Sequence, residues 1–162
     1  MAMFYGSIVG AVISALSSNP LVSVAHKDGA DRIIIRDTVE LAAAAANDTV
    51  SLVKVDWETV INPDTSKFWF DDLGTGNTVS IGDVTYPNAL CNAQDTSTAA
   101  GSALIMKSVD VANYFKPLWQ VLGYASLAAA KAVGTKCELL AKVNSAAATG
   151  TLTWQIFGAK KI

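Results

Sequence analysis

The chain is poor in reactive and charged side chains. Its 162 residues include two cysteines and one histidine, and charged residues make up only 16% of the sequence. Cys91 and Cys137 are far apart and form no CxxC pair, and one histidine cannot complete a zinc site with them. We therefore expect two buried thiols, with neither a disulfide nor a metal. The net charge of -2 argues against a nucleic-acid partner, which requires a basic surface.

The chain also lacks the groupings that catalysis requires. A catalytic triad or a cysteine nucleophile would have to use His26, which lies in a segment expected to form an arm rather than part of a rigid sheet. The sequence contains no G-x-S-x-G elbow and no Gly-Lys-Ser/Thr loop, and Gly74-x-Gly76 lacks the third glycine of a dinucleotide site. We therefore predict that the protein is not an enzyme and binds no cofactor.

The densest acidic cluster is Asp71-Asp72, which Asp83 follows after a turn. Calcium favours several oxygens on one loop, but this spacing does not match an EF-hand. Adjacent strand residues point to opposite faces, so the pair cannot act across a glycosidase cleft. We expect these carboxylates to be structural.

No apolar run is long enough to predict a membrane span. Residues 4–16 are apolar, but they fall short of the ~20 residues that a helix needs to cross a bilayer. No Lys or Arg precedes Lys27, so the segment also lacks the basic start of a signal peptide. We predict no membrane partner.

Apolar residues are abundant, at 51% of the chain. With so few charges, this composition favours a surface that is partly buried against partner molecules. The alternative is that alanine-rich stretches, such as residues 42–46 and 125–132, inflate the apolar share.

Residues 1–30 differ from the rest because they are poor in charge and rich in small and β-branched residues. The β-branched residues weaken a helix here. We predict an N-terminal arm over residues 1–30 that becomes ordered on a neighbouring molecule, and the alternative is a first element of the domain's own core. The candidate partner-binding residues of the arm are Phe4, Tyr5, Ile8, Val12 and Leu16.

Residues 31–162 predict an all-β domain. Short apolar or alternating runs are separated by turn residues. Strands are expected at 32–36, 38–41, 49–55, 102–106, 138–143 and 151–157, with a helical turn at 86–93. Residues 66–84 predict two strands that reverse at Gly74 and Gly76. Helical spacing over 109–122, and Ser126 as a cap for 127–133, predict one or two short inserted helices. The whole pattern indicates an antiparallel, two-sheet, jelly-roll-like sandwich.

Alternation along residues 66–70 predicts one exposed aromatic ring. If Phe68 and Phe70 point inward, Trp69 points outward, where a large ring is a good contact anchor. The segment 109–123 carries more apolar residues than one helix face needs, so Tyr114 and Trp119 are further candidate partner-binding residues. Of the other aromatic residues beyond the arm, Trp57, Tyr86, Phe115 and Trp154 are expected mostly in the core.

Several short stretches together resemble a known family. They are Asp37-Thr-Val-Glu-Leu-Ala, Asn47-Asp-Thr-Val-Ser-Leu, Ser66-Lys-Phe-Trp-Phe-Asp-Asp-Leu-Gly, Ile81-Gly-Asp and Thr149-Gly-Thr-Leu-Thr. With them, residues 31–157 resemble the head decoration, or cement, proteins of tailed bacteriophages. The segment Tyr114–Trp119 departs from the family's pattern.

The resemblance implies a structural virion protein, made in the host cytoplasm, that binds the capsid exterior and bridges neighbouring major capsid proteins. It also implies self-association as a trimer or dimer, arms that reach neighbouring capsomers, and neither cofactor nor active site. Exposed aromatic residues also suit a sugar-binding surface. The alternative function is therefore a carbohydrate- or receptor-binding module of a phage head fibre or tail.

Overall fold

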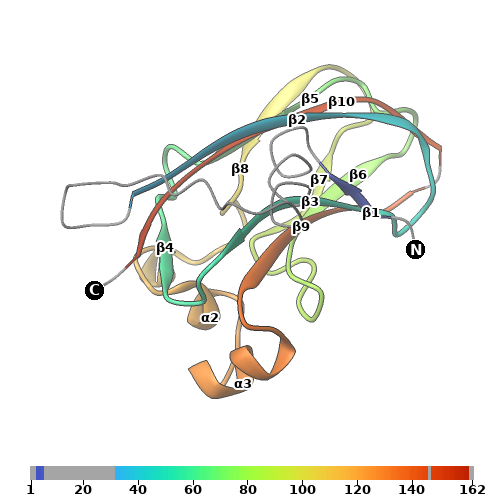
Figure 1. The fold of residues 1–162 in the computed structure, drawn as a ribbon. Coiled ribbons are helices and arrows are strands. Elements are labelled where there is room, and N and C mark those ends of the chain that lie inside the picture. The colour runs from blue at the N-terminus through green and yellow to red at the C-terminus, as the bar shows by residue number, and fades with distance from the viewer. Residues whose placement is uncertain (1–2, 6–31, 146, 161–162) are drawn as a thin grey trace, which may run out of the picture.

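The computed structural model describes residues 32–145 and 147–160, together with the backbone of residues 3–5. Within these residues the chain forms ten strands and three short helical segments (Figure 1). The strands are β1 (Met3–Tyr5), β2 (Arg32–Ala44), β3 (Thr49–Val55), β4 (Thr59–Ile61), β5 (Lys67–Phe70), β6 (Thr78–Gly82), β7 (Cys91–Asp95), β8 (Gly101–Leu104), β9 (Cys137–Val143) and β10 (Ala148–Lys160). The helical segments are η1 (Val111–Asn113), α2 (Leu118–Val121) and α3 (Leu127–Val133).

The strands form two layers. Sheet A has the order β1-β3-β9-β6-β7, and sheet B has the order β2-β10-β5-β8, with β4 also paired to β10. The β1–β3 pair is parallel, and the other pairs are antiparallel. In Figure 1, β2 and β10 run side by side in one layer, β3 and β9 lie in the other, and α2 and α3 lie beyond β9.

The connectivity of these strands is that of a jelly roll. With β1 and β4 set aside, every link between successive strands crosses from one sheet to the other, except the β6–β7 hairpin. The first long strand, β2, pairs with the last, β10, from Arg32↔Ala159 to Ala44↔Ala148. Eight strands in two sheets with these links are the defining pattern of the fold. The predicted all-β, two-sheet sandwich is confirmed.

The core lies between the sheets, and one hydrogen bond spans it. Among its largest fully buried side chains are Trp57, Phe68 and Trp154. The β3–β9 register shifts between Ser51 and Val53, which leaves Leu52 without a ladder partner. The Trp154 indole in sheet B donates to the Leu52 carbonyl in sheet A at 3.0 Å. The bulge therefore presents a buried acceptor that the indole N–H satisfies.

Helix α3 begins and ends where the sequence predicted. α3 spans residues 127–133, as predicted, and the Ser126 hydroxyl accepts from the Ala129 amide at 3.1 Å. Gly134 follows the helix, and its carbonyl accepts from the Trp57 indole at 2.8 Å. The inserted helices are thus tied to the loop that leaves β3. No helix within the described residues is both long and apolar enough to cross a bilayer.

The predicted β-reversal over residues 66–84 is wrong in its pairing. Both strands exist, but β5 lies in sheet B and β6 lies in sheet A. Gly74 and Gly76 have φ values of 101° and 71°, and the chain between the strands crosses the end of the sandwich with Leu73 fully buried. Each strand turns an apolar face to the shared core, so the same alternation fits strands of opposite sheets.

Two other predicted elements differ from those observed. The helical turn expected over residues 86–93 is confined to a turn after Tyr86, because Cys91 already pairs with Ile81 in the β6–β7 hairpin. The strands expected at 32–36 and 38–41 form a single strand, β2, which continues into the alanine run. Asp37, between the two expected strands, is buried and remains within the ladder to β10.

Candidate interaction surface

The outer face of sheet B carries the predicted exposed tryptophan. Phe68 and Phe70 point into the core, while Trp69 between them is 40% exposed, so the predicted alternation is confirmed. The strand register places one outward residue from each of four strands in a row. That row is Thr38, Thr153, Trp69 and Ser102. We call the outer surface of β2, β10, β5 and β8 the sheet-B face.

A shallow hollow of about 570 Å³ lies beside Trp69. Its polar lining includes the hydroxyls of Ser102, Thr151 and Thr153, and the carboxylate of Asp71. Thr151 donates to a Glu40 carboxylate oxygen at 2.8 Å, so part of this polar surface is already hydrogen-bonded. The hollow therefore combines one indole face with neutral hydroxyls and an acidic group.

A second exposed aromatic residue, which sequence reasoning missed, adjoins the start of β2. Phe115, expected in the core, is 75% exposed, and Ile34 is 59% exposed. The two side chains line an apolar hollow of about 410 Å³ together with Phe157 and Ile61. We call this region the Phe115 patch.

Phe115 is exposed because the chain around it turns too tightly to present one continuous helix face. η1 is a single turn, and Pro117 separates it from α2. Of residues 111–122, only Leu118 and Leu122 are then fully buried. An apolar count alone could not distinguish Phe115 from these two buried residues.

Tyr114 and Trp119 are half-buried and pack against the core rather than standing free. The Trp119 amide donates to the Trp57 carbonyl at 3.2 Å, which fixes α2 against the loop that follows β3. No contact in the structure tests whether these two residues bind a partner, so that role stays a prediction.

The candidate residues of the arm fall into two groups. Phe4 and Tyr5 belong to β1, whose backbone pairs with Val50 and Ser51 of β3 in the chain's own sheet A. For residues 3–5, this pairing is the intramolecular alternative left open by the sequence. Ile8, Val12, Leu16 and also His26 lie outside the described residues.

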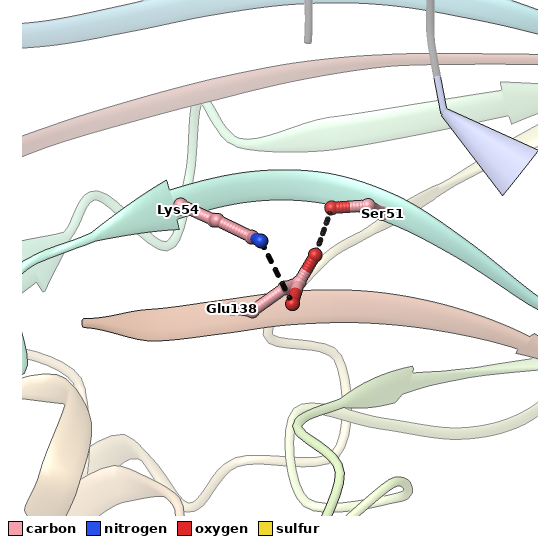
Figure 2. Close-up of polar contacts among 3 residues, drawn as sticks. All are labelled: Ser51, Lys54 and Glu138. Atoms are coloured by element: carbon pink, nitrogen blue, oxygen red, sulfur yellow. Dashed lines mark hydrogen bonds and ion pairs between the residues drawn. The ribbon is translucent and has the colours of Figure 1, made fainter. Parts of the chain in front are cut away.

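The outer face of sheet A holds a small polar network (Figure 2). The Ser51 hydroxyl donates to Glu138 at 2.6 Å, and Lys54 pairs with the same carboxylate at 3.3 Å. Residues three apart on a regular strand point to opposite faces, but the bulge at Leu52 brings Ser51 and Lys54 to one side. The Ser51 hydroxyl and the Lys54 ammonium group are thus both paired with the Glu138 carboxylate.

A hollow of about 500 Å³ adjoins this network, between β3, β9 and the end of α3. Lys54, Lys136 and Lys142 line it together with Asp83 and Glu138. Its mixed charges and its apolar walls favour no single class of ligand.

The acidic side chains are structural, as predicted. Asp71 accepts from the Thr151 amide at 3.1 Å, and Asp72 accepts from the Gly74 amide at 2.9 Å in the turn. Asp83 is buried and accepts from the Tyr86 amide at 2.6 Å. Asp72 and Asp83 each close a local turn, whereas Asp71 joins the segment after β5 to β10. Within the described residues, no group of three or more acidic, histidine or cysteine side chains could hold a metal.

Tyr124 completes the hydrogen bonding of Asp83. Its buried hydroxyl donates to the second carboxylate oxygen of Asp83. Burial, followed by this hydrogen bond, raises the pKa of Tyr124 to about 12. Its ring makes edge-to-face contacts with Trp57 and Tyr86, with centroids 5.2 Å and 4.9 Å apart. The pair joins the loop after β6 to the segment between α2 and α3.

Cys91 and Cys137 are free and buried, which confirms the prediction for them. Burial raises the pKa of each thiol above its ordinary value. Because the thiolate is the reactive form, both groups are suited to packing and not to nucleophilic chemistry.

Comparison with known proteins gives one likeness that covers the whole chain. No protein-family model and no curated protein matches the sequence. A solved structure, the capsid of Ralstonia phage GP4, contains a chain with a TM-score of 0.56 and 16% sequence identity, and the match covers 99% of both chains. At this identity the likeness establishes the fold alone. This protein therefore shares its fold with a chain of a phage capsid, and the likeness covers 99% of both chains.

Proposed function

We propose that the chain is a structural virion protein that binds the outer surface of a tailed-phage capsid and bridges neighbouring major capsid proteins. The observation that carries the proposal is the likeness to a chain of the phage GP4 capsid, which spans 99% of both chains. The family resemblance of residues 31–157 supports decoration of the shell as the specific role. No catalytic step or cofactor enters the proposal.

The sheet-B face supplies a plausible geometry for such adhesion. Trp69 lies on this face, and so does Ile34 of the Phe115 patch, with one row of outward residues between their two rows, Arg36, Gln155 and Lys67. Four residues along β2 separate the two anchor rows, which is about 13 Å at the rise of a strand. Two apolar anchors with a polar row between them resemble the hot spots and surround of a protein interface.

Bridging requires a second point of attachment, which we assign to the N-terminal arm. In this proposal Phe4, Tyr5, Ile8, Val12 and Leu16 contact one capsid subunit while the sheet-B face contacts another. Simultaneous contact raises the effective affinity of two individually weak interfaces. Tyr114 and Trp119, beside the Phe115 patch in sequence, would extend the body contact.

The test is occupancy of capsids by variant proteins. Trp69→Ala should weaken capsid binding by about 30-fold, or ~2 kcal/mol, because exposed tryptophans are frequent hot spots. Val84→Ala is the matched control, since Val84 is an exposed apolar residue on the loop after β6 and away from the sheet-B face. Equal binding by the two variants, both with unchanged thermal stability, would remove Trp69 from the interface.

The composition of virions tests the role itself. Quantitative mass spectrometry of purified particles should find the chain in hundreds of copies, and surface labelling should modify it on intact capsids. A copy number of a few per particle would contradict a decoration role and favour a fibre or tail component.

A second function is favoured by the hollow beside Trp69. An indole face next to the Ser102, Thr151 and Thr153 hydroxyls and the Asp71 carboxylate is an arrangement suited to stacking and hydrogen-bonding a sugar ring. Binding on a glycan array that Trp69→Ala abolishes, without any binding to capsids, would establish this alternative.

A further inference from the structure

In the part of the chain that the structure describes, the outer edge of β2 is an open sheet edge. β2 is thirteen residues long and stands at the end of the order β2-β10-β5-β8. Among the described residues, no strand pairs with its outer side. Open edges of this length are templates for pairing with another strand.

The hydrogen bonds of β10 show which β2 residues direct their backbone N–H and C=O groups toward the open edge. The Asn62 amide donates to the Phe157 carbonyl at 2.9 Å, and the Asp71 amide donates to the Thr151 carbonyl at 3.1 Å. Odd-numbered residues of β10 therefore turn their backbone groups away from β2, toward β4 and β5. From Gly150 to Gly158, before the register shift at Ala148, even-numbered residues turn toward β2, where their register partners are odd-numbered, as in Trp154↔Asp37.

It follows that the even-numbered residues of β2 direct their N–H and C=O groups outward. The side chains of these residues also lie on the exposed sheet-B face, because backbone and side-chain directions alternate together along a strand. They are Arg32, Ile34, Arg36, Thr38, Glu40 and Ala42.

This series is complementary to itself in one antiparallel register. A two-fold axis at Thr38 places Arg36 of each copy opposite Glu40 of the other. It also places Thr38 opposite the second copy's Thr38 and the exposed Ile34 opposite the small Ala42. Opposite charges and paired threonines across strands are stabilising, and the Ile34–Ala42 pair joins a large side chain to a small one.

Two neighbouring registers are not complementary. An axis at Arg36 would place two guanidinium groups directly opposite each other, which is destabilising. An axis at Asp37 would place two buried aspartates opposite each other and leave Glu40 facing Ile34. The charges on the edge therefore favour the axis at Thr38 over these two registers.

We propose that two copies of the chain associate through their β2 edges, antiparallel, with the two-fold axis at Thr38. The two B sheets then form one continuous sheet. One existing bond must be exchanged: the Thr38 amide bonds the Asp37 carboxylate at 2.9 Å, and pairing replaces that acceptor with the carbonyl of the second copy's Thr38. The proposal depends on strand register and not on the capsid role, so either can fail alone.

Disulfide trapping of the full-length protein tests the pairing. Residues that exchange both backbone hydrogen bonds have Cα atoms about 5.5 Å apart, within the range a disulfide spans. Under mild oxidation, Thr38→Cys should give a covalent dimer at least ten times faster than Thr153→Cys, which occupies the same row one strand inward. The native thiols are buried and do not compete.

Two further variants test the register. Arg36→Cys would cross-link readily only if the axis were at Arg36, so it should react no faster than Thr153→Cys. In the Thr38→Cys background, Arg36→Glu should slow dimer formation at least tenfold, because it places two carboxylates opposite each other, and adding Glu40→Arg should restore the rate. Equal rates for Thr38→Cys and Thr153→Cys, fastest trapping by Arg36→Cys, or no effect of charge reversal would each overturn the proposal.

Discussion

The hydrogen bond between Tyr124 and Asp83 should make a measurable and pH-dependent contribution to stability. Asp83 is 1% exposed, and its two carboxylate oxygens accept from the loop amides and from the Tyr124 hydroxyl. Tyr124→Phe keeps the ring contacts with Trp57 and Tyr86 but removes the donor. The variant therefore isolates one bond to a buried acceptor.

The magnitude follows from that environment. Hydrogen bonds to charged groups contribute about 1.5–3 kcal/mol, and a buried acceptor left without its donor loses the same order of free energy. For a chain of this size, each kcal/mol shifts the melting temperature by roughly 2–4 °C. We expect Tyr124→Phe to lower the free energy of unfolding by about 2 kcal/mol and the melting temperature by roughly 4–8 °C.

The pH dependence has a defined sign. The raised pKa of Tyr124 means that folding favours the protonated hydroxyl. The stabilisation is complete below the ordinary pKa of 10 and is lost as pH rises toward about 12. The difference between wild type and Tyr124→Phe should be constant from pH 7 to 9 and shrink above pH 10.

Urea unfolding followed by tryptophan fluorescence, at several pH values, measures this difference. Tyr86→Phe is the matched control, because Tyr86 also contacts the Tyr124 ring but is exposed, and its free energy of unfolding should change by less than ~0.5 kcal/mol. A Tyr124→Phe variant as stable as wild type at pH 8, or a difference that grows above pH 10, would refute the reasoning.

Three further changes probe other features. Gly82→Ala should destabilise the fold by more than ~3 kcal/mol in chemical denaturation, because its Cβ would lie 1.9 Å from the Tyr86 carbonyl oxygen; a mild effect would show that the loop can shift. Cys91 and Cys137 should react with a thiol reagent at least about a hundredfold more slowly in the folded than in the denatured protein, since both are buried with raised pKa values. Ser126→Ala should cost about 1 kcal/mol of unfolding free energy through the lost helix cap, and an unchanged value would count against that cap.

Local patterns predicted the features that depend on neighbouring residues. Alternation placed Phe68 and Phe70 inside and Trp69 outside, because a strand presents successive side chains to opposite faces. Ser126 and Gly134 bounded α3, because capping is a matter of a few residues. The scarcity of histidine and the spacing of the cysteines predicted buried thiols, and the structure contains them.

The exposure of Phe115 was beyond that reasoning. Its sequence neighbours supply apolar residues at helical spacing, which resembles a buried face. Exposure depends on what packs above the residue, and a single turn followed by Pro117 turns Phe115 away from the core. The candidate surface therefore gained an anchor that only the tertiary structure could show.

The sequence by itself determined that this protein is a strand-rich sandwich with little reactive chemistry, because alternation, turn residues and composition are local quantities. Only the tertiary structure decided the partners of each strand. β5 and β6 look like a hairpin but belong to opposite sheets, and β2 pairs with β10 from the other end of the chain. Both sheets turn the same apolar pattern toward one core, so periodicity gives the face of a strand but not its sheet. Packing of the whole chain makes that choice.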